Sequence, residues 1–209
     1  MKVRIKMSIF FHKNDLPDDL KLGKSIAIDT ETRGLNLNRD RLCLIQLSNG
    51  NGDAHLVQIA AEKKQCPNLS ALLKDPTVEK LFHFARFDLA ILTRDICPVQ
   101  GPVYCTKIAS NLARTYTDRH GLKDLCSELL SVEISKQQQS SDWGADILSD
   151  AQKNYAASDV LYLHKLKDKL NQQLEREGRL ELAFHCFSFL THRVTLDLRG
   201  FADLDIFHH

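Results

Sequence analysis

Apolar and polar residues follow a strand-like pattern through about the first sixty positions. Residues 25–31 combine β-branched and small apolar side chains with no charge before Asp29, which predicts a buried strand. The Asn-Gly cluster at residues 49–53 separates two further apolar runs and indicates a hairpin. We therefore expect this half to form an antiparallel meander, with residues 3–12 as an edge strand. The expected strands are residues 3–12, 25–31, 41–48 and 54–59.

From residue 68 onward, short apolar runs alternate with segments of helical periodicity. Such β-α alternation predicts a mixed sheet with helices on its faces. The expected strands are residues 78–84 and 102–106, and the expected helices are residues 68–74, 87–95, 107–115 and 121–130. Residues 133–145 are polar and predict an irregular segment.

The C-terminal third has a strong helical pattern. Ser149 and Gln152 form a capping-box signature, which predicts a helix start. The apolar positions that follow recur every three or four residues, the spacing of a helix with one buried stripe. They are Ala156, Val160, Leu163, Leu166, Leu170 and Leu174. We expect one long helix from residue 149 to about 178, and a second over residues 180–198.

Composition narrows the class of protein. The 209 residues are 43% hydrophobic and 26% charged, with a net charge of +1, which suits one globular domain over residues 1–209. This charge does not by itself indicate a nucleic-acid-binding protein, although acidic residues at a metal site can mask a basic groove. The six cysteines show no zinc-ligand spacing and favour a reducing, cytoplasmic location. No apolar run reaches transmembrane length, so we expect no membrane partner.

Asp29 and Glu31 are the first candidates for chemistry. Residues i and i+2 of a strand share a face, so the two carboxylates would lie side by side at the end of the strand. Two such charges repel each other and favour a cation between them. The alternative is that Asp29 caps a turn and Glu31 is solvated.

Three later residues could join this pair. Asp88 follows a strand near the start of a helix, where the helix dipole also favours an aspartate. Tyr155 and Asp159 are four residues apart on the long helix and share a face, although Asp159 could instead lie at the solvent edge. Four carboxylates would suit two Mg²⁺ or Mn²⁺ ions, which together promote phosphodiester hydrolysis. Tyr155 could orient or deprotonate the attacking water.

The order Asp29-x-Glu31, Asp88, Tyr155-x-x-x-Asp159 resembles the three exonuclease motifs of the DEDD superfamily, tyrosine subtype. The flanking sequences resemble those of ribonuclease D between about residues 25 and 170. The matching segments are Ile28-Asp29-Thr30-Glu31, Leu44-Ile45-Gln46-Leu47, Gly121-Leu122-Lys123-Asp124-Leu125, Ser141-Asp142-Trp143 and Tyr155-Ala156-Ala157-Ser158-Asp159.

The resemblance implies a ribonuclease H-like α/β fold, with a mixed five- or six-stranded sheet, flanking helices and a helical extension over about residues 178–200. It also implies a metal-dependent 3′→5′ exonuclease that releases nucleoside 5′-monophosphates from single-stranded 3′ ends of RNA. Asp29, Glu31, Asp88 and Asp159 would be the ligands of two divalent cations. Tyr155 would position the nucleophilic water, and Glu31 would be catalytic as well as a ligand. Ribonuclease D carries further C-terminal helical domains, and we expect this protein to be a short form without them.

Several other positions are candidates for substrate contacts. They are Thr30, Leu35, Gln46, His83, Lys123 and Lys136. Leu35 could wedge against the terminal base or pack in its turn, and Gln46 could touch substrate or make a hydrogen bond at the sheet edge. His83 could support a ligand or be a buried histidine, while the two lysines could bind phosphate or be solvated. We expect Trp143 to pack the irregular loop.

Two other functions remain open at this point. A DNA exonuclease similar to that of Werner helicase would carry the same motifs, because no residue is identified as reading the 2′-hydroxyl. A catalytically silent nucleic-acid-binding module is the third hypothesis. It is disfavoured because every ligand position is filled. The pattern does not define the oligomeric state.

Overall fold

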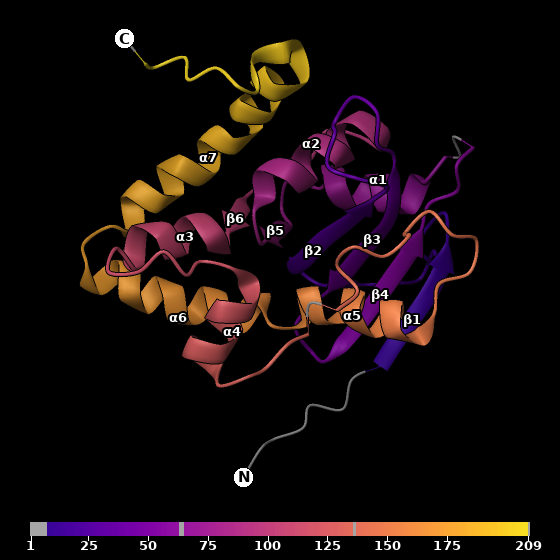
Figure 1. Ribbon diagram of the computed structural model, residues 1–209, viewed down its shortest axis with the longest axis horizontal. Helices are drawn as coiled ribbons and strands as arrows, with labels where there is room; N and C mark the ends of the chain where they lie inside the picture. The colour runs from indigo at the N-terminus through magenta and orange to yellow at the C-terminus, as the bar shows by residue number, and fades with distance from the viewer. Residues whose placement is uncertain (1–7, 63–64, 136, 209) are drawn as a thin grey trace.

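Six strands form one mixed sheet in the computed structural model, which describes residues 8–62, 65–135 and 137–208 (Figure 1). In sheet order they run β1-β4-β3-β2-β5-β6. Their bounds are Ser8–Lys13 (β1), Ser25–Thr32 (β2), Leu42–Ser48 (β3), Asp53–Gln58 (β4), Glu79–Phe82 (β5) and Val103–Cys105 (β6). This architecture confirms the expected α/β class and the mixed sheet.

The first four strands are only partly the predicted meander. β2, β3 and β4 are successive antiparallel neighbours, and the turn between β3 and β4 contains Gly50 and Gly52 at φ values of 82° and 104°. Such positive values favour glycine, which is why this hairpin could be predicted from the sequence. β1 is an edge strand as predicted, but it pairs in parallel with β4, so the antiparallel prediction was wrong for this strand. Residues 3–7 of the predicted edge strand lie outside the described residues.

The helices largely follow the predicted order. Those of the first part are α1 (Pro67–Lys74), α2 (Ala85–Asp95), α3 (Thr106–Ala113) and α4 (Leu122–Leu130). The predicted single helix from residue 149 is wrong, because it is divided into α5 (Asp150–Leu161) and α6 (Leu163–Arg176). Tyr162 lies between them with φ −108° and ψ −6°, which lets α5 pack on the sheet and α6 on α3 and α4. The sequence does not show the break because the apolar spacing continues through it.

The two faces of the sheet carry different helices. α5 packs on β2, β3 and β4, while α2 packs on β2, β3 and β5. Alternate side chains of β3 divide accordingly: Leu44 joins a cluster with Ala156 of α5, whereas Ile45 joins the main core with Leu89 of α2. The same alternation in β2 decides which face each active-site candidate meets.

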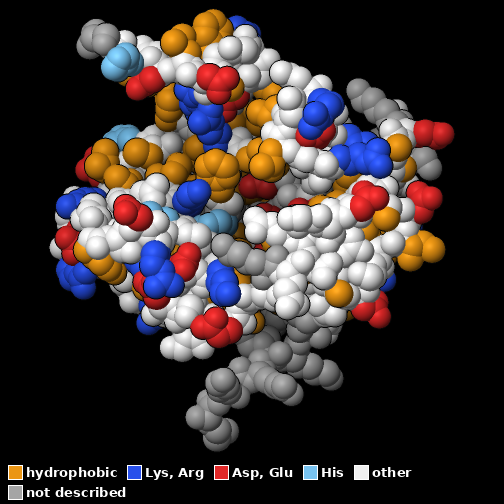
Figure 2. Space-filling view, viewed as in Figure 1, with side chains coloured by type: hydrophobic (Ala, Val, Ile, Leu, Met, Phe, Trp, Pro, Cys, Tyr) orange, Lys and Arg blue, Asp and Glu red, His pale blue; other side chains and the backbone are white. Residues whose placement is uncertain are grey.

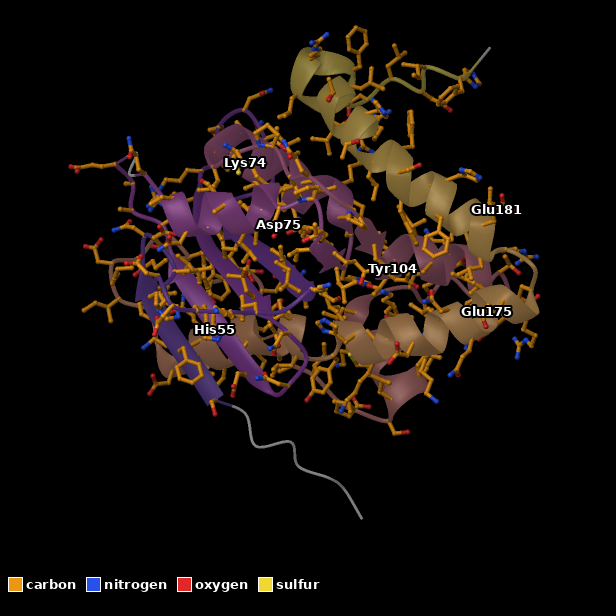
Figure 3. The ribbon with its side chains drawn as sticks, turned by 180° about the vertical axis from the view of Figure 1, so that it is seen from behind. His55, Lys74, Asp75, Tyr104, Glu175 and Glu181 are labelled. Atoms are coloured by element: carbon orange, nitrogen blue, oxygen red, sulfur yellow. The ribbon has the colours of Figure 1, made fainter. Side chains whose placement is uncertain are left out.

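The C-terminal helices form a second layer beside β6 (Figure 1). α7 (Leu180–Leu196) continues into the short segment Asp197–Phe201, in which the backbone kinks at Gly200 with φ 92°. Viewed from behind, Tyr104 of β6 lies where the helices meet the sheet (Figure 3). Its hydroxyl donates to Asn171 of α6 at 2.9 Å, and its ring centroid is 4.6 Å from that of Phe187 of α7. Tyr104 therefore connects the sheet to both helices.

The structure bears on two predictions, the buried cysteine thiols and the lack of a membrane-spanning segment. All six cysteines are thiols, and five of them are buried in the interior as predicted, while Cys186 is half-buried. Within the described ranges, no helix has both the length and the apolar character that crossing a bilayer requires.

Candidate active site

The end of β2 delivers two carboxylates toward α5. Asp29 pairs with Gln46 and Glu31 with Leu44 in the antiparallel register with β3, so both acids share the sheet face that α5 covers. Asp159, on α5, meets them there: one carboxylate oxygen from each of the three residues lies within 4.8 Å of the others. A register shift follows Glu31, and the strand ends one residue later. Sequence spacing and sheet geometry together therefore gather three acids at one strand end.

The fourth acid, Asp88, arrives from the opposite face. It lies in the first turn of α2, and its carboxylate accepts a 2.6 Å hydrogen bond from the Thr30 hydroxyl. Thr30 alternates with Asp29 and Glu31 and so points toward α2. This explains why Asp88 is separate from the group of three, although it lines the same cleft.

The pKa values of the four carboxyl groups are all raised by burial, and those of three of them also by the charges of the neighbouring acids. Burial raises the pKa of Asp29 to about 7. Burial, and then the charges of Asp29, Asp159 and Asp88, raise the pKa of Glu31 to about 10. Burial first and the charge of Asp29 second place the pKa values of Asp88 and Asp159 well above the usual range. Ionising all four groups therefore requires added positive charge.

This donor set fits hard divalent cations. Within the described residues, no lysine, arginine or histidine forms an ion pair with any of the four acids. Carboxylate oxygens are the ligands of Mg²⁺ and Mn²⁺, whereas zinc and copper sites draw on imidazole or thiolate. The side chains present would hold such a cation between Asp29, Glu31 and Asp159, with Asp88 beside Asp29.

Tyr155 stands one helical turn before Asp159 and is fixed by its neighbours. Its ring lies 6.0 Å, centroid to centroid, from that of Trp143. Trp143 is only 2% exposed, which confirms that it packs the irregular loop. Burial, followed by the charges of Asp159, Glu31 and Asp29, raises the pKa of the Tyr155 hydroxyl above its usual range. At neutral pH the phenol keeps its proton and is suited to orient a water molecule.

The four acids and Tyr155 line one cleft of about 330 Å³. In the space-filling view, red acidic side chains lie in a hollow near the middle of the molecule, bordered by orange apolar side chains below α7 (Figure 2). Four candidates for substrate contact also line it, namely Thr30, Leu35, His83 and Lys123. Leu35 is 84% exposed, so it is available to a ligand and is not packed in the core.

His83 has a defined hydrogen-bond role at the cleft wall. The Thr106 hydroxyl donates to the carbonyl of Phe82 at 3.1 Å and also forms a 2.9 Å hydrogen bond with His83 Nδ1. This bond fixes the orientation of the imidazole ring at the cleft.

Two other candidates are not brought to the cleft. Gln46 is fully buried on the central strand β3, so its side chain neither lines the cleft nor lies at a sheet edge, contrary to both readings of the sequence. Its amide has no hydrogen-bond partner in the described part of the chain and lies across from Asp29. Lys136 lies outside the described residues.

The structure adds two residues that the motifs did not reveal. Phe84 and Lys107 line the cleft beside the acids, at the ends of the parallel strands β5 and β6. The carboxyl ends of parallel strands are a common ligand-binding position. A search for side chains at or directly after the ends of the predicted strands 78–84 and 102–106 could therefore have found both.

A mixed sheet that gathers four acids and a tyrosine in this way matches the ribonuclease H-like fold of DEDD exonucleases. A family described as 3′–5′ exonuclease matches residues 11–175. The chain belongs to this family, which confirms the resemblance to ribonuclease D-like exonucleases.

Two solved structures of one relative cover the whole fold. Brucella melitensis NrnC bound to pGG is 59% identical, with a TM-score of 0.93, and the match covers 97% of this chain and 99% of that one. The same relative with bound Mg²⁺ is 58% identical, with a TM-score of 0.92 and coverage of 97% and 100%.

A curated relative, ribonuclease D of Acidiphilium cryptum, is 35% identical over 166 residues, which are 79% of this chain and 42% of the relative. The chain thus spans about two fifths of the length of the curated ribonucleases D that it matches. The family match over residues 11–175 contains every acid of the cleft.

Proposed function

We propose that the protein is a metal-dependent 3′→5′ exoribonuclease that releases nucleoside 5′-monophosphates one at a time. One observation carries the proposal: four acids from β2, α2 and α5 line one cleft with Tyr155, and no cationic side chain of the described chain pairs with them. Such an arrangement costs folding free energy, which a purely structural role leaves unexplained.

Asp29, Glu31, Asp88 and Asp159 would hold two divalent cations. The cations would supply charge neutralisation for the attacking and leaving oxygens of an in-line displacement. Support comes from the 58% identical relative, whose structure contains Mg²⁺. The count of two ions, and Mn²⁺ as an alternative metal, belong to the proposal.

The side chains of the chain define the rest of the reaction. Tyr155 orients a water whose oxygen attacks the phosphorus of the last phosphodiester bond, and Glu31 accepts the water's proton. The bond between phosphorus and the 3′-oxygen of the preceding nucleotide breaks, and that oxygen gains a proton. The products are a nucleoside 5′-monophosphate and a chain one nucleotide shorter that again ends in a 3′-hydroxyl.

The small volume of the cleft and the exposed Leu35 favour a single-stranded end as the substrate. Its volume of about 330 Å³ is at the small end of ligand sites, and exposed Leu35 stands at its edge where it can wedge against the last base. The Brucella relative was solved with pGG, which makes pGG a suitable short substrate for this chain. We also propose that the protein is one exonuclease domain over residues 1–209 that acts in the cytoplasm, where its six cysteine thiols remain reduced.

The test is hydrolysis of a 5′-labelled RNA oligonucleotide with a 3′-hydroxyl, and of pGG, in Mg²⁺ or Mn²⁺ and in EDTA. We expect a ladder shortened by single nucleotides, with 5′-monophosphates identified by mass spectrometry and no reaction in EDTA. Asp29→Asn should abolish the reaction with an unchanged circular-dichroism spectrum, whereas Asp168→Asn, an exposed aspartate on α6, should react as the parent does.

Matched DNA run in parallel assigns sugar specificity. Faster shortening of DNA than of RNA would replace the proposed substrate with DNA. RNA bound equally in Mg²⁺ and EDTA but never shortened would identify a silent binding module.

A further inference from the structure

Phe84 has a backbone conformation that phenylalanine rarely adopts. It precedes α2 with φ 69° and ψ 46°, in the left-handed region where glycine and asparagine are favoured. Strained positions of this kind persist where the surrounding structure holds them, and they cluster at functional sites. Phe82, two residues earlier, and Ala85, directly after, are fully buried, whereas Phe84 itself is exposed.

Phe84 lies outside the core and lines both the acidic cleft and an apolar groove that includes Ile108 and Leu190. It is 47% exposed, and it lines the cleft together with Asp29 and Asp88. The other aromatic residues that line this cleft within the described chain, Phe87 and Tyr155, are only half-exposed. An apolar ring left in water beside a catalytic cleft provides a flat surface for another ring.

Lys107 lies beside the Phe84 ring at the edge of the cleft. Its ammonium lies 4.3 Å from the centroid of the Phe84 ring, and it also lines the cleft from the first turn of α3. Within the described residues it forms no ion pair. A cation held above an aromatic ring, close to four acids that would be neutralised by metal, is positioned to meet a phosphate.

We propose that Phe84 is a stacking platform for a nucleobase of the substrate and that Lys107 contacts the adjoining phosphate. Both are substrate-positioning residues, and the proposal rests on the function proposed above. Stacking on an aromatic ring tolerates any base, so the pair would grip a strand end without regard to sequence.

The decisive variant is Phe84→Asn, because asparagine accepts the left-handed conformation and removes the ring. The melting temperature should therefore equal or exceed that of the parent. KM for a 3′-hydroxyl RNA should rise about fivefold or more, the size expected for one lost stacking contact, and the loss should fall on KM and not on kcat. Phe10→Asn is the matched control, since Phe10 is 44% exposed on β1, at the far edge from β5 and β6, and it should keep the parent's KM.

An oligonucleotide whose two 3′-terminal nucleotides lack bases separates stacking from a structural effect. Parent and Phe84→Asn should have equal KM values on this substrate, because the contact is absent from both reactions. An equal loss on base-containing and abasic RNA would overturn the platform, and so would a parent-like KM on both.

Lys107 is tested by the salt dependence of binding. In an Asp29→Asn background, which leaves RNA intact, Lys107→Gln should reduce the slope of log Kd against log salt by about 0.7, the value for one phosphate contact on a single strand. Lys165→Gln, an exposed lysine on α6, should leave the slope unchanged. An unchanged slope in Lys107→Gln would refute the phosphate contact.

The same measurements distinguish this proposal from the proposed function. If the parent binds RNA without shortening it, the nuclease assignment fails, while the affinities of Phe84→Asn for base-containing and abasic RNA still decide the platform. If the parent shortens RNA and Phe84→Asn matches it on both substrates, only the platform fails. A parent that neither binds nor shortens RNA would overturn both.

Discussion

Glu31→Gln should stabilise the metal-free protein, although it removes a residue proposed to be essential for activity. Burial and the charges of Asp29, Asp159 and Asp88 raise the pKa of Glu31 from 4.5 to about 10. Between these values the folded metal-free protein keeps a proton that the unfolded chain releases, so stability falls as pH rises. Glu31 lowers the free energy of unfolding of the metal-free protein by nothing below about pH 4.5 and by about 1.4 kcal/mol more for each pH unit above it. At pH 7 this loss of stability is about 3 kcal/mol.

A neutral glutamine has no proton to release on unfolding, so it does not lower the stability of the metal-free protein in this way. In EDTA at pH 7, Glu31→Gln should melt about 6 °C or more above the parent, because each kcal/mol corresponds to about 2–4 °C in a chain of this size. Differential scanning calorimetry from pH 4 to 8 should show the two proteins converging at the acid end. Glu175→Gln, on an exposed position of α6 (Figure 3), should follow the parent at every pH.

Divalent metal should reverse the order. Mg²⁺ should raise the melting temperature of the parent, and more so at pH 8 than at pH 5, whereas Glu31→Gln should respond weakly. A Glu31→Gln variant that melts at or below the parent in EDTA at pH 7 would refute the account of the acid cluster.

Three further outcomes follow from other contacts. Thr30→Val removes the 2.6 Å bond to Asp88 and should weaken metal affinity about tenfold, measured by isothermal titration calorimetry; unchanged affinity would show that Thr30 does not position Asp88. Tyr155→Phe should lower kcat about 100-fold with little change in melting temperature, and a parent-like kcat would remove Tyr155 from the reaction. Asp197→Asn breaks the bidentate pair with Arg86 and should cost about 2–3 kcal/mol in urea unfolding, with a loss below about 0.5 kcal/mol contradicting this.

Local chemistry made much of the fold predictable. The strand around Asp29, the glycine-containing hairpin at residues 49–53 and the capping box at Ser149 each depend on neighbouring residues, and the structure contains all three. The parallel pairing of β1 with β4 and the break at Tyr162 depend on which distant surfaces the chain must cover. No short segment of sequence carries that information.

The same distinction applies to the candidate site. The shared face of Asp29 and Glu31 follows from strand periodicity, and that of Tyr155 and Asp159 from helix periodicity. The approach of Asp88 through Thr30 requires the parallel pairing of β2 with β5, which only the assembled sheet shows. Gln46 was misjudged for a related reason, because its burial is set by the strands on both sides of β3.

The central claim is that four acids hold divalent cations beside Tyr155. Anomalous diffraction from crystals soaked in Mn²⁺ tests it most directly. We expect one manganese peak between Asp29, Glu31 and Asp159, and a second beside Asp29 and Asp88. Crystals that show no manganese at these carboxylates, or show it only at other sites, would contradict the claim.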